Sequence, residues 1–306
     1  MSFDLDSARR RKLGYQLIDR VDEFYSSLPD LAVQLPLEKR SYGPLSNPLP
    51  ETGEDPVKVL DDLCREMVDK GFHVPSANYF GLMNPTPTYM SFLGEALVAA
   101  LNPQLATLAR SQLASKIELE TVRWIGERVG WPGAFNGTFT SGGNEANFSG
   151  MTLALAAHFP QVVEEGVLAI GAQPVLYASA ESHHSLDKSA GLLGIGRRAL
   201  RRIAVDDQLR MDLTKLERAI AEDRAAGNKP FCVVATAGTT NSGIVDDLVA
   251  MADICERHKL WLLVLTVRLP SFPTAIAISS TESSALIPSP SIPTSGWPCP
   301  MRRALS

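Results

Sequence analysis

Two continuously apolar runs, Phe231–Ala235 and Leu260–Val264, constrain the fold of this chain more than any other feature. A strand that is apolar along its whole length is covered on both faces, as the strands of a parallel sheet are. Other short β-rich runs lie at 137–140, 174–178 and 201–205. Helical patterns separate these runs, and strands that alternate with helices predict an α/β fold with a mainly parallel sheet.

Residues 1–78 are predicted to form an N-terminal helical arm. Segments 6–28 and 57–70 repeat apolar side chains at helical spacing, and a proline-rich connector at 45–56 separates them. An exposed apolar stripe on such a helix pair favours packing on a partner subunit. A plain pair of surface helices is the alternative interpretation.

The composition limits the classes of partner and location. The net charge of -5 provides no basic surface, which argues against nucleic acid or an anionic membrane as the main partner. No apolar run approaches the length of a membrane span, and the first residues lack the apolar core of a signal peptide. The 4 cysteines are scattered, as is typical of reduced thiols, so we predict a cytoplasmic protein.

The segment Thr138–Asn147 reads T-F-T-S-G-G-N-E-A-N and contains the first chemical motif. A strand is predicted to end at Ser141-Gly-Gly, with a helix starting directly after it. Glycines let the backbone approach a ligand closely, and the free N–H groups of a helix start suit an anion such as phosphate. A tight strand-to-helix turn without a ligand is the equally weighted alternative.

Two further polar segments follow predicted strands. Residues 182–188 read S-H-H-S-L-D-K, and residues 235–243 read A-T-A-G-T-T-N-S-G. Ligands of α/β proteins bind at the carboxyl ends of strands, although exposed histidines and a polar turn are the structural alternatives. No cysteine or histidine at ligand spacing supports a metal site. Asp246 and Asp247 are interpreted as caps of the helix that follows.

Taken together, these motifs resemble the group II pyridoxal-phosphate (PLP) decarboxylases, which include the aromatic amino acid, tyrosine, histidine and glutamate decarboxylases. The similarity runs from about Tyr79 to Val264 and also includes Y-F-G-L-M-N-P-T-P and E-L-E-T-V-R-W. It implies that residues 79–264 form an incomplete PLP-binding large domain of the type I aminotransferase fold. It further implies PLP as cofactor, an L-amino acid as substrate, a homodimer, and a C-terminal domain that is missing here.

The resemblance also implies roles for individual residues. Gly143 and Asn144 correspond to the backbone turn that holds the PLP phosphate. His183 corresponds to the histidine that stacks on the pyridine ring, with His184 as a weaker candidate. Thr240 corresponds to a threonine that contacts the cofactor, and Thr86 corresponds to the lining of the substrate pocket.

The chain departs from the family pattern at two essential positions. Leu265 and Thr266 follow the last apolar run, where the family has the aspartate that pairs with the pyridinium nitrogen. The lysine that forms the Schiff base is also missing, because the last lysine, Lys259, precedes that run. With no catalytic residue of this set present, we predict that the chain as translated does not decarboxylate amino acids.

Residues 265–306 have a different character and are predicted to be an aberrant, disordered tail. From residue 266 onward the chain contains seven prolines, no lysine and no aspartate. Back-translation of the segment from Pro288 to Met301 with permitted synonymous codons, read one base out of frame, gives I-T-V-D-P-H-K-W-L-A-M-P-Y. D-P-H-K-W resembles the cofactor-lysine motif of the same family, and its lysine spans the codons of Thr294 and Ser295. The sequence therefore predicts a frameshift after about Val264. A chance match in an ordinary disordered Pro/Ser tail is the alternative.

Two other interpretations of the whole chain remain open at this stage. The first is a non-catalytic fragment that dimerises or binds PLP without the lysine. The second is another PLP lyase, because S-G-G-x-E also suits enzymes similar to sphingosine-phosphate lyase.

Overall fold

The computed structural model describes residues 5–39, 48, 51–81, 84, 86–128, 136–266 and 276–280. These residues divide into two compact units, Met1–Leu97 and Val98–Ser306, and each is described by itself. The division lies further along the chain than the boundary predicted at residue 78. Among the described residues, no helix is long and apolar enough to cross a membrane.

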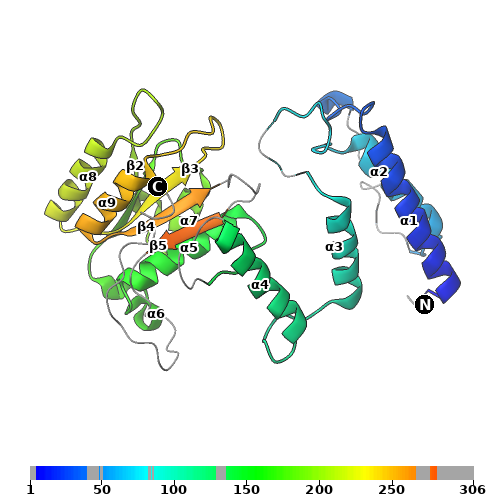
Figure 1. The fold of residues 1–306 in the computed structure, drawn as a ribbon, viewed down its shortest axis with the longest axis horizontal. Coiled ribbons are helices and arrows are strands. Elements are labelled where there is room, and N and C mark those ends of the chain that lie inside the picture. The colour runs from blue at the N-terminus through cyan, green and yellow to red at the C-terminus, as the bar shows by residue number, and fades with distance from the viewer. Residues whose placement is uncertain are drawn as a thin grey trace. The chain divides into compact units, whose positions relative to one another are not determined.

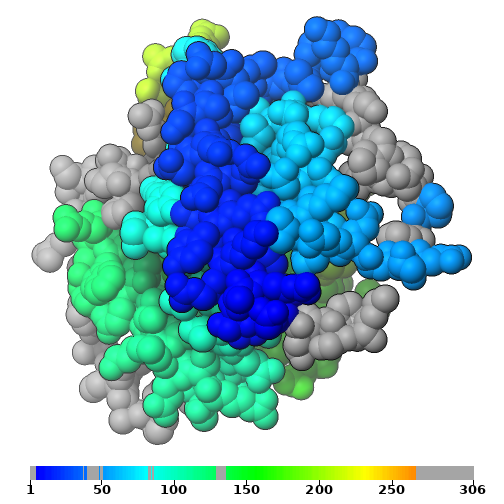
Figure 2. Space-filling model, turned by 90° about the vertical axis from the view of Figure 1, so that its right-hand side faces the viewer, coloured from blue at the N-terminus to red at the C-terminus, as the bar shows by residue number. Residues whose placement is uncertain are grey.

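The first unit is built on two helices that lie side by side, α1 (Ser7–Ser27) and α2 (Pro56–Lys70) (Figures 1 and 2). Both helices predicted for the arm are thereby confirmed. Asp6 caps α1 by accepting a hydrogen bond from the Arg9 amide at 2.8 Å. Asp55 caps α2 in the same way, with a proline at the start of the helix. A short 3-10 helix, Leu37–Lys39, lies between them, and α3 (Tyr89–Leu101) follows and crosses the unit boundary.

Neither α1 nor α2 buries a residue completely. On α2 the apolar stripe that the sequence predicts is exposed, with Val59, Leu63 and Met67 at 47%, 56% and 65% of their full accessibility. Polar contacts join the two helices instead. The Arg20 guanidinium of α1 pairs with the Asp61 carboxylate of α2, and the Gln16 amide donates to the Val57 carbonyl at 3.2 Å.

The second unit is an α/β layer structure. Its elements in chain order are α4 (Gln112–Arg128), α5 (Gly143–His158), α6 (Val162–Glu165), η3 (Val167–Ile170), β1 (Pro174–Ser179), α7 (Ser185–Leu192), η4 (Arg197–Ala199), β2 (Leu200–Ile203), α8 (Leu213–Ala225), β3 (Lys229–Ala237), α9 (Leu248–His258), β4 (Trp261–Thr266) and β5 (Ile276–Ser280). The strand order is β2-β1-β3-β4-β5. All pairs among the first four strands are parallel, and β5 is antiparallel to β4.

The two faces of the sheet carry separate apolar cores, which follow the two-residue alternation of a strand. Figure 1 shows helices on both sides of the sheet. On the side of α5 and α7 the buried side chains include Met151, Leu176, Leu186, Val234 and Leu263. On the side of α8 and α9 they include Tyr177, Leu216, Ile220, Val233 and Met251. Strands covered on both faces explain the continuously apolar runs in the sequence.

One predicted strand is wrong. Residues 137–140 form no regular secondary structure. The carboxylate of Glu118, on α4, accepts hydrogen bonds from the Phe139 amide at 2.9 Å and from the Thr138 hydroxyl at 2.8 Å. The Phe139 N–H is therefore already hydrogen-bonded to the Glu118 side chain and is not available to pair with a neighbouring strand.

The end of the described chain differs in part from the predicted tail. Strand β4 continues through Leu265 and Thr266, and Ile276–Ser280 forms a strand, although residues 265–306 are predicted to be disordered. Residues 267–275 and 281–306 lie outside the described residues. The frameshifted lysine codons at Thr294 and Ser295 fall in that part.

Candidate functional site

Helix α5 begins at Gly143 with no side chain capping it. The amides of Gly143 and Asn144 lie in the first turn, where no earlier carbonyl of the helix accepts them, and both residues are exposed. Within the described chain, nothing outside its immediate neighbours lies within 4 Å of a Cβ built at Gly142, so the space beside the turn is open. Uncapped N–H groups at the positive end of a 16-residue helix are chemically suited to an anion.

A carboxylate fixes the turn in front of α5. Glu145 accepts hydrogen bonds from the Ser141 amide at 2.7 Å and from the Ser141 hydroxyl at 2.6 Å. These bonds hold the pKa of Glu145 below its usual value. The glutamate of the G-G-N-E motif thus shapes the loop, while the next amides remain available for a ligand.

The loop between β1 and α7 is held by a guanidinium from β2. Arg202 donates from Nη1 to the carbonyls of Ser179 and Ser182, at 3.0 and 2.9 Å. Its Nη2 pairs with the Asp187 carboxylate of α7 at 2.6 Å. This loop carries His183 and His184, so Arg202 fixes the backbone from which both imidazoles extend.

His183 and His184 lie against each other, with ring centroids 4.2 Å apart. Burial lowers the pKa of His183, and the charges of His184, Lys188 and Arg202 lower it further. The Ser185 hydroxyl bonds to His183 Nδ1 at 2.9 Å and accepts from Nδ2 of the Asn147 side chain, on α5, at 2.8 Å. Hydrogen bonds therefore connect the start of α5 to His183.

The end of β3 meets the same loop. The hydroxyls of Ser182 and Thr236 are hydrogen-bonded at 3.0 Å, and both residues are buried. Asp246 accepts from the amides of Thr236 and Met211, each at 2.8 Å. Burial raises the pKa of this carboxyl group, although both amide bonds oppose the rise.

The interpretation of Asp246 as a helix cap is wrong. Asp247 caps α9 by accepting from the Ala250 amide at 3.0 Å, whereas Asp246 is buried and joins β3 to the chain before α8. Adjacent aspartates before a helix are indistinguishable by sequence, because only the fold decides which one points inward. Asn147, Ser185 and Arg202 were also missed as site residues. Asn147 is the last residue of the T-S-G-G-x-E-A-N motif, and Ser185 is the serine of the H-x-S-x-x-K motif. Their places in these motifs are the sequence signal that indicates them.

Thr240 lies in the turn after β3 and is half-buried. The preceding residue, Thr239, uses its hydroxyl within the turn, toward Ser242 Oγ at 2.6 Å and the Ile244 amide at 3.1 Å. Gly238 and Gly243 have positive φ angles of 106° and 68°, which glycine adopts without strain. No hydrogen bond from the Thr240 hydroxyl is seen within the described residues, so it can serve a ligand.

The next-to-last residue of β4, Leu265, is apolar where the family resemblance expects an aspartate. Leu265 pairs in register with Thr236 and packs in the core on the side of α5 and α7. The hydroxyl of Thr266 donates to the Ala237 carbonyl at 3.1 Å. Lys259 precedes β4 and ends α9, so it lies at the opposite end of that strand.

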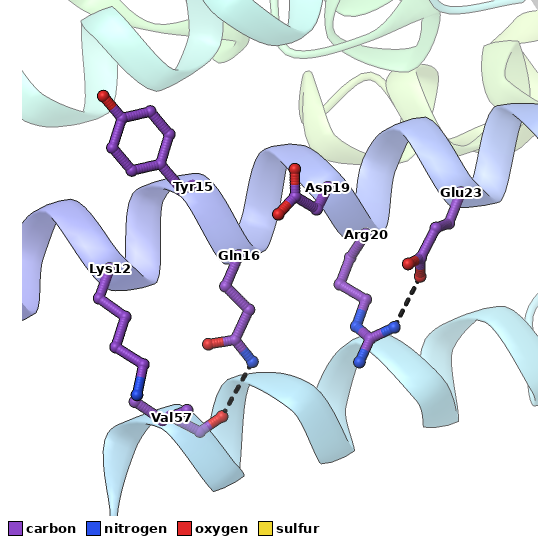
Figure 3. Close-up of a pocket in the computed structure, with 7 residues that line it drawn as sticks. All are labelled: Lys12, Tyr15, Gln16, Asp19, Arg20, Glu23 and Val57. Atoms are coloured by element: carbon purple, nitrogen blue, oxygen red, sulfur yellow. Dashed lines mark hydrogen bonds and ion pairs between the residues drawn. The ribbon is translucent and has the colours of Figure 1, made fainter.

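Thr86 belongs to the first unit and is exposed. Nearby, the Tyr79 hydroxyl donates to Asn84 Oδ1 at 2.7 Å. A pocket between α1 and α2 also belongs to this unit (Figure 3). Its lining residues are Lys12, Tyr15, Gln16, Asp19, Arg20, Glu23 and Val57. Charged side chains dominate the lining, and none of the predicted cofactor residues belongs to it.

Residues 39–265 match the family model described as the pyridoxal-dependent decarboxylase conserved domain. The chain belongs to this family. An aromatic-L-amino-acid decarboxylase of Bacillus atrophaeus is 31% identical over 262 residues, which are 85% of this chain and 53% of that protein. The acidic amino acid decarboxylase GADL1 of Homo sapiens is 34% identical over 214 residues, 70% of this chain and 40% of that protein. The chain thus spans about half the length, or less, of these relatives.

Solved structures share the fold. Mouse CSAD in its apo form superimposes with a TM-score of 0.77 at 28% identity, covering 85% of this chain and 55% of that chain. The Oryza sativa TDC structure with PLP and tryptamine has a TM-score of 0.78 at 22% identity, covering 86% and 56%. The predicted family and α/β fold class are confirmed, and the family is pyridoxal-dependent, as predicted.

The donors of the second unit fit the phosphate of PLP. Free amides at the start of α5 suit its negative charge, and an imidazole of lowered pKa and a threonine hydroxyl lie on loops of the same sheet edge. In contrast, within the described residues no group of three or more His, Cys, Asp or Glu side chains could hold a metal ion.

Proposed function

We propose that this chain binds PLP without a covalent bond and does not decarboxylate amino acids as translated. The proposal is carried by one observation: hydrogen bonds join the start of α5, the loop of His183 and the end of β3 at one edge of a parallel sheet. The intact member of this lineage is proposed to convert an L-amino acid to an amine and CO2.

The residues have distinct proposed roles. The amides of Gly143 and Asn144 bind the phosphate, His183 lies against the pyridine ring, and Thr240 donates or accepts at the cofactor. Thr86 lines the substrate pocket. PLP, when bound, supplies an electron sink that weakens the bond between the substrate Cα and its carboxylate.

Two missing groups support the loss of activity. Leu265 offers no carboxylate to keep the pyridine nitrogen protonated, and no lysine follows Lys259. One inserted or deleted base near codon 264 accounts for both, because the shifted frame restores an aspartate there and a lysine across codons 294 and 295. Sequencing the DNA over codons 255–306 tests this directly. An indel whose reversal restores V-D and D-P-H-K-W supports it, and codons that encode neither motif in the shifted frame contradict it.

The binding experiment uses the purified 306-residue chain. We expect saturable PLP binding that dialysis removes, no lysine adduct after borohydride reduction, and no 14CO2 from carboxyl-labelled amino acids. Gly143→Asp places a carboxylate against the phosphate and should abolish binding. The helix start itself tolerates aspartate, so folding should persist.

Thr214→Asp is the matched control, since it adds the same charge to the first turn of α8 and should leave PLP binding unchanged. A reduced adduct that maps to Lys188, the lysine whose charge acts on His183, overturns the non-covalent model. Release of CO2 overturns the loss of activity. Equal PLP affinity in the Gly143→Asp chain overturns the phosphate site.

The exposed stripe on α2 favours a second proposed property, which is assembly into a homodimer. Val59, Leu63 and Met67 follow one another at intervals of four residues, so they lie on one helix face. A chain of this kind that binds PLP but lacks the lysine would still dimerise. Such a chain could act as a non-catalytic subunit that dimerises with an intact copy of the enzyme, which is the alternative function.

A further inference from the structure

The hydrogen bonds around His183 define which ring nitrogen carries the proton. The backbone amide of Ser185 donates to His183 Nδ1 at 3.2 Å. An amide N–H can only donate, so Nδ1 must be unprotonated and accept this bond. A neutral imidazole then carries its proton on Nε2.

The same argument settles the direction of the second bond. The Ser185 hydroxyl lies 2.9 Å from Nδ1, which has no proton to give, so the hydroxyl is the donor. The side-chain Nδ2 of Asn147 donates to Ser185 Oγ at 2.8 Å. Because Asn147 occupies one acceptor position on this oxygen, it favours turning the hydroxyl proton toward His183.

The charges around His183 also favour its neutral form. Burial lowers the pKa of His183 most, and the charges of His184, Lys188 and Arg202 lower it further. Lys188 and Arg202 are cationic side chains. The Asp187 carboxylate holds Arg202 in place. A second proton on the imidazole would face these charges and would also displace both donors from Nδ1.

We propose that Ser185, oriented by Asn147, is a positioning residue that holds His183 as a neutral imidazole protonated on Nε2. The inference rests on the proposed PLP site, because it specifies the form of the ring that meets the cofactor. It assigns a role in that site to two residues on different helices. Ser185 is buried at the start of α7, and Asn147 lies on the second turn of α5.

The test is a proton–nitrogen NMR titration of the 15N-labelled chain without cofactor, with the His183 signals assigned from His183→Gln. We expect a pyridine-type Nδ1 and a pyrrole-type Nε2 in the unchanged chain. Ser185→Ala removes one donor from Nδ1 and should raise the His183 pKa by about 0.5–1 unit. Asn147→Ala should raise it by less, and Ser185→Thr, which keeps the hydroxyl, should leave it nearly unchanged.

Ser189→Ala is the matched control. Ser189 lies one turn further along α7, is equally buried, and its hydroxyl has no hydrogen-bond partner within the described chain. Removal of that hydroxyl should leave the His183 titration unchanged. Far-UV circular dichroism reports whether each variant folds, and the Asn147→Ala and Ser185→Thr results apply even if Ser185→Ala does not fold.

The proposal is overturned if Nδ1 carries the proton in the unchanged chain. It is also overturned if Ser185→Ala and Ser189→Ala titrate alike, or if Ser185→Thr behaves as the alanine variant does. The readout needs no PLP. A chain with the expected His183 signals that fails to bind PLP therefore contradicts the proposed function and leaves this inference intact.

Discussion

The two units of this chain differ in whether they contain an apolar core. In the described part of the second unit, side chains such as Leu263 and Phe231 in one core and Met251 in the other are completely buried. In the described part of the first unit no apolar side chain is buried, and Leu63 retains 56% of its accessibility. Both units expose apolar side chains, Leu113 and Leu168 among them in the second. The second unit differs because it also contains buried cores that stabilise it, whereas the described part of the first unit has none.

The largest expected effect comes from removing the same side chain in each unit. Leu263→Ala should lower the free energy of unfolding by about 2–5 kcal/mol, because it leaves a cavity in the core. Leu63→Ala should change it by less than about 0.5 kcal/mol, as is usual for exposed positions. Urea denaturation followed by circular dichroism measures both, and equal losses would contradict the comparison.

A second, smaller effect tests the polar network of the second unit. Asp223 accepts hydrogen bonds from the Tyr177 hydroxyl at 3.0 Å, from Arg201 at 2.7 Å and from Asn228 at 2.7 Å. Asp223→Ala leaves these donors without their acceptor and should cost about 1–3 kcal/mol. Arg65→Ala in the first unit removes only exposed pairs to Asp61 and Asp62 and should cost less than about 1 kcal/mol.

The same carboxylate gives a pH dependence. Burial alone would raise the pKa of Asp223, but the bonds from Arg201, Asn228 and Tyr177 outweigh it, so the pKa lies below the usual 3.8. A lowered pKa in the folded state contributes stability above pH 4, roughly, and that contribution is lost as the pH falls through the folded value. Asp223→Asn should flatten the acid limb of the stability profile, and an unchanged limb would count against this network.

The smallest effect on folding, and the sharpest test of the first unit, concerns its exposed stripe. Leu63→Glu should change the free energy of unfolding by less than about 0.5 kcal/mol while weakening self-association in sedimentation velocity. Leu168→Glu is the control, because Leu168 is an exposed apolar residue of the second unit. A monomeric unchanged chain, or equal behaviour of both variants, would contradict a homodimer through α2.

The fold was largely predictable because its signals are local. The runs Phe231–Ala235 and Leu260–Val264 lie in β3 and at β4, and the helical patterns of 6–28 and 57–70 lie on α1 and α2. The strand predicted at residues 137–140 is wrong because a β-rich composition does not guarantee a strand to pair with. There, Glu118 binds the backbone from a distant part of the sequence. The cytoplasmic location and the individual site roles stay predictions.

The sequence by itself determined the family, the α/β layers and the absence of the lysine and aspartate, because motif order and residue identity are readable along the chain. Only the tertiary structure decided that Asp246 is buried rather than a cap, that Arg202 fixes the His183 loop, and that Asn147 meets Ser185. These contacts join residues far apart in the sequence, and hydrogen bonds depend on distance and direction in space. No local pattern encodes which side chains will meet at the edge of a sheet.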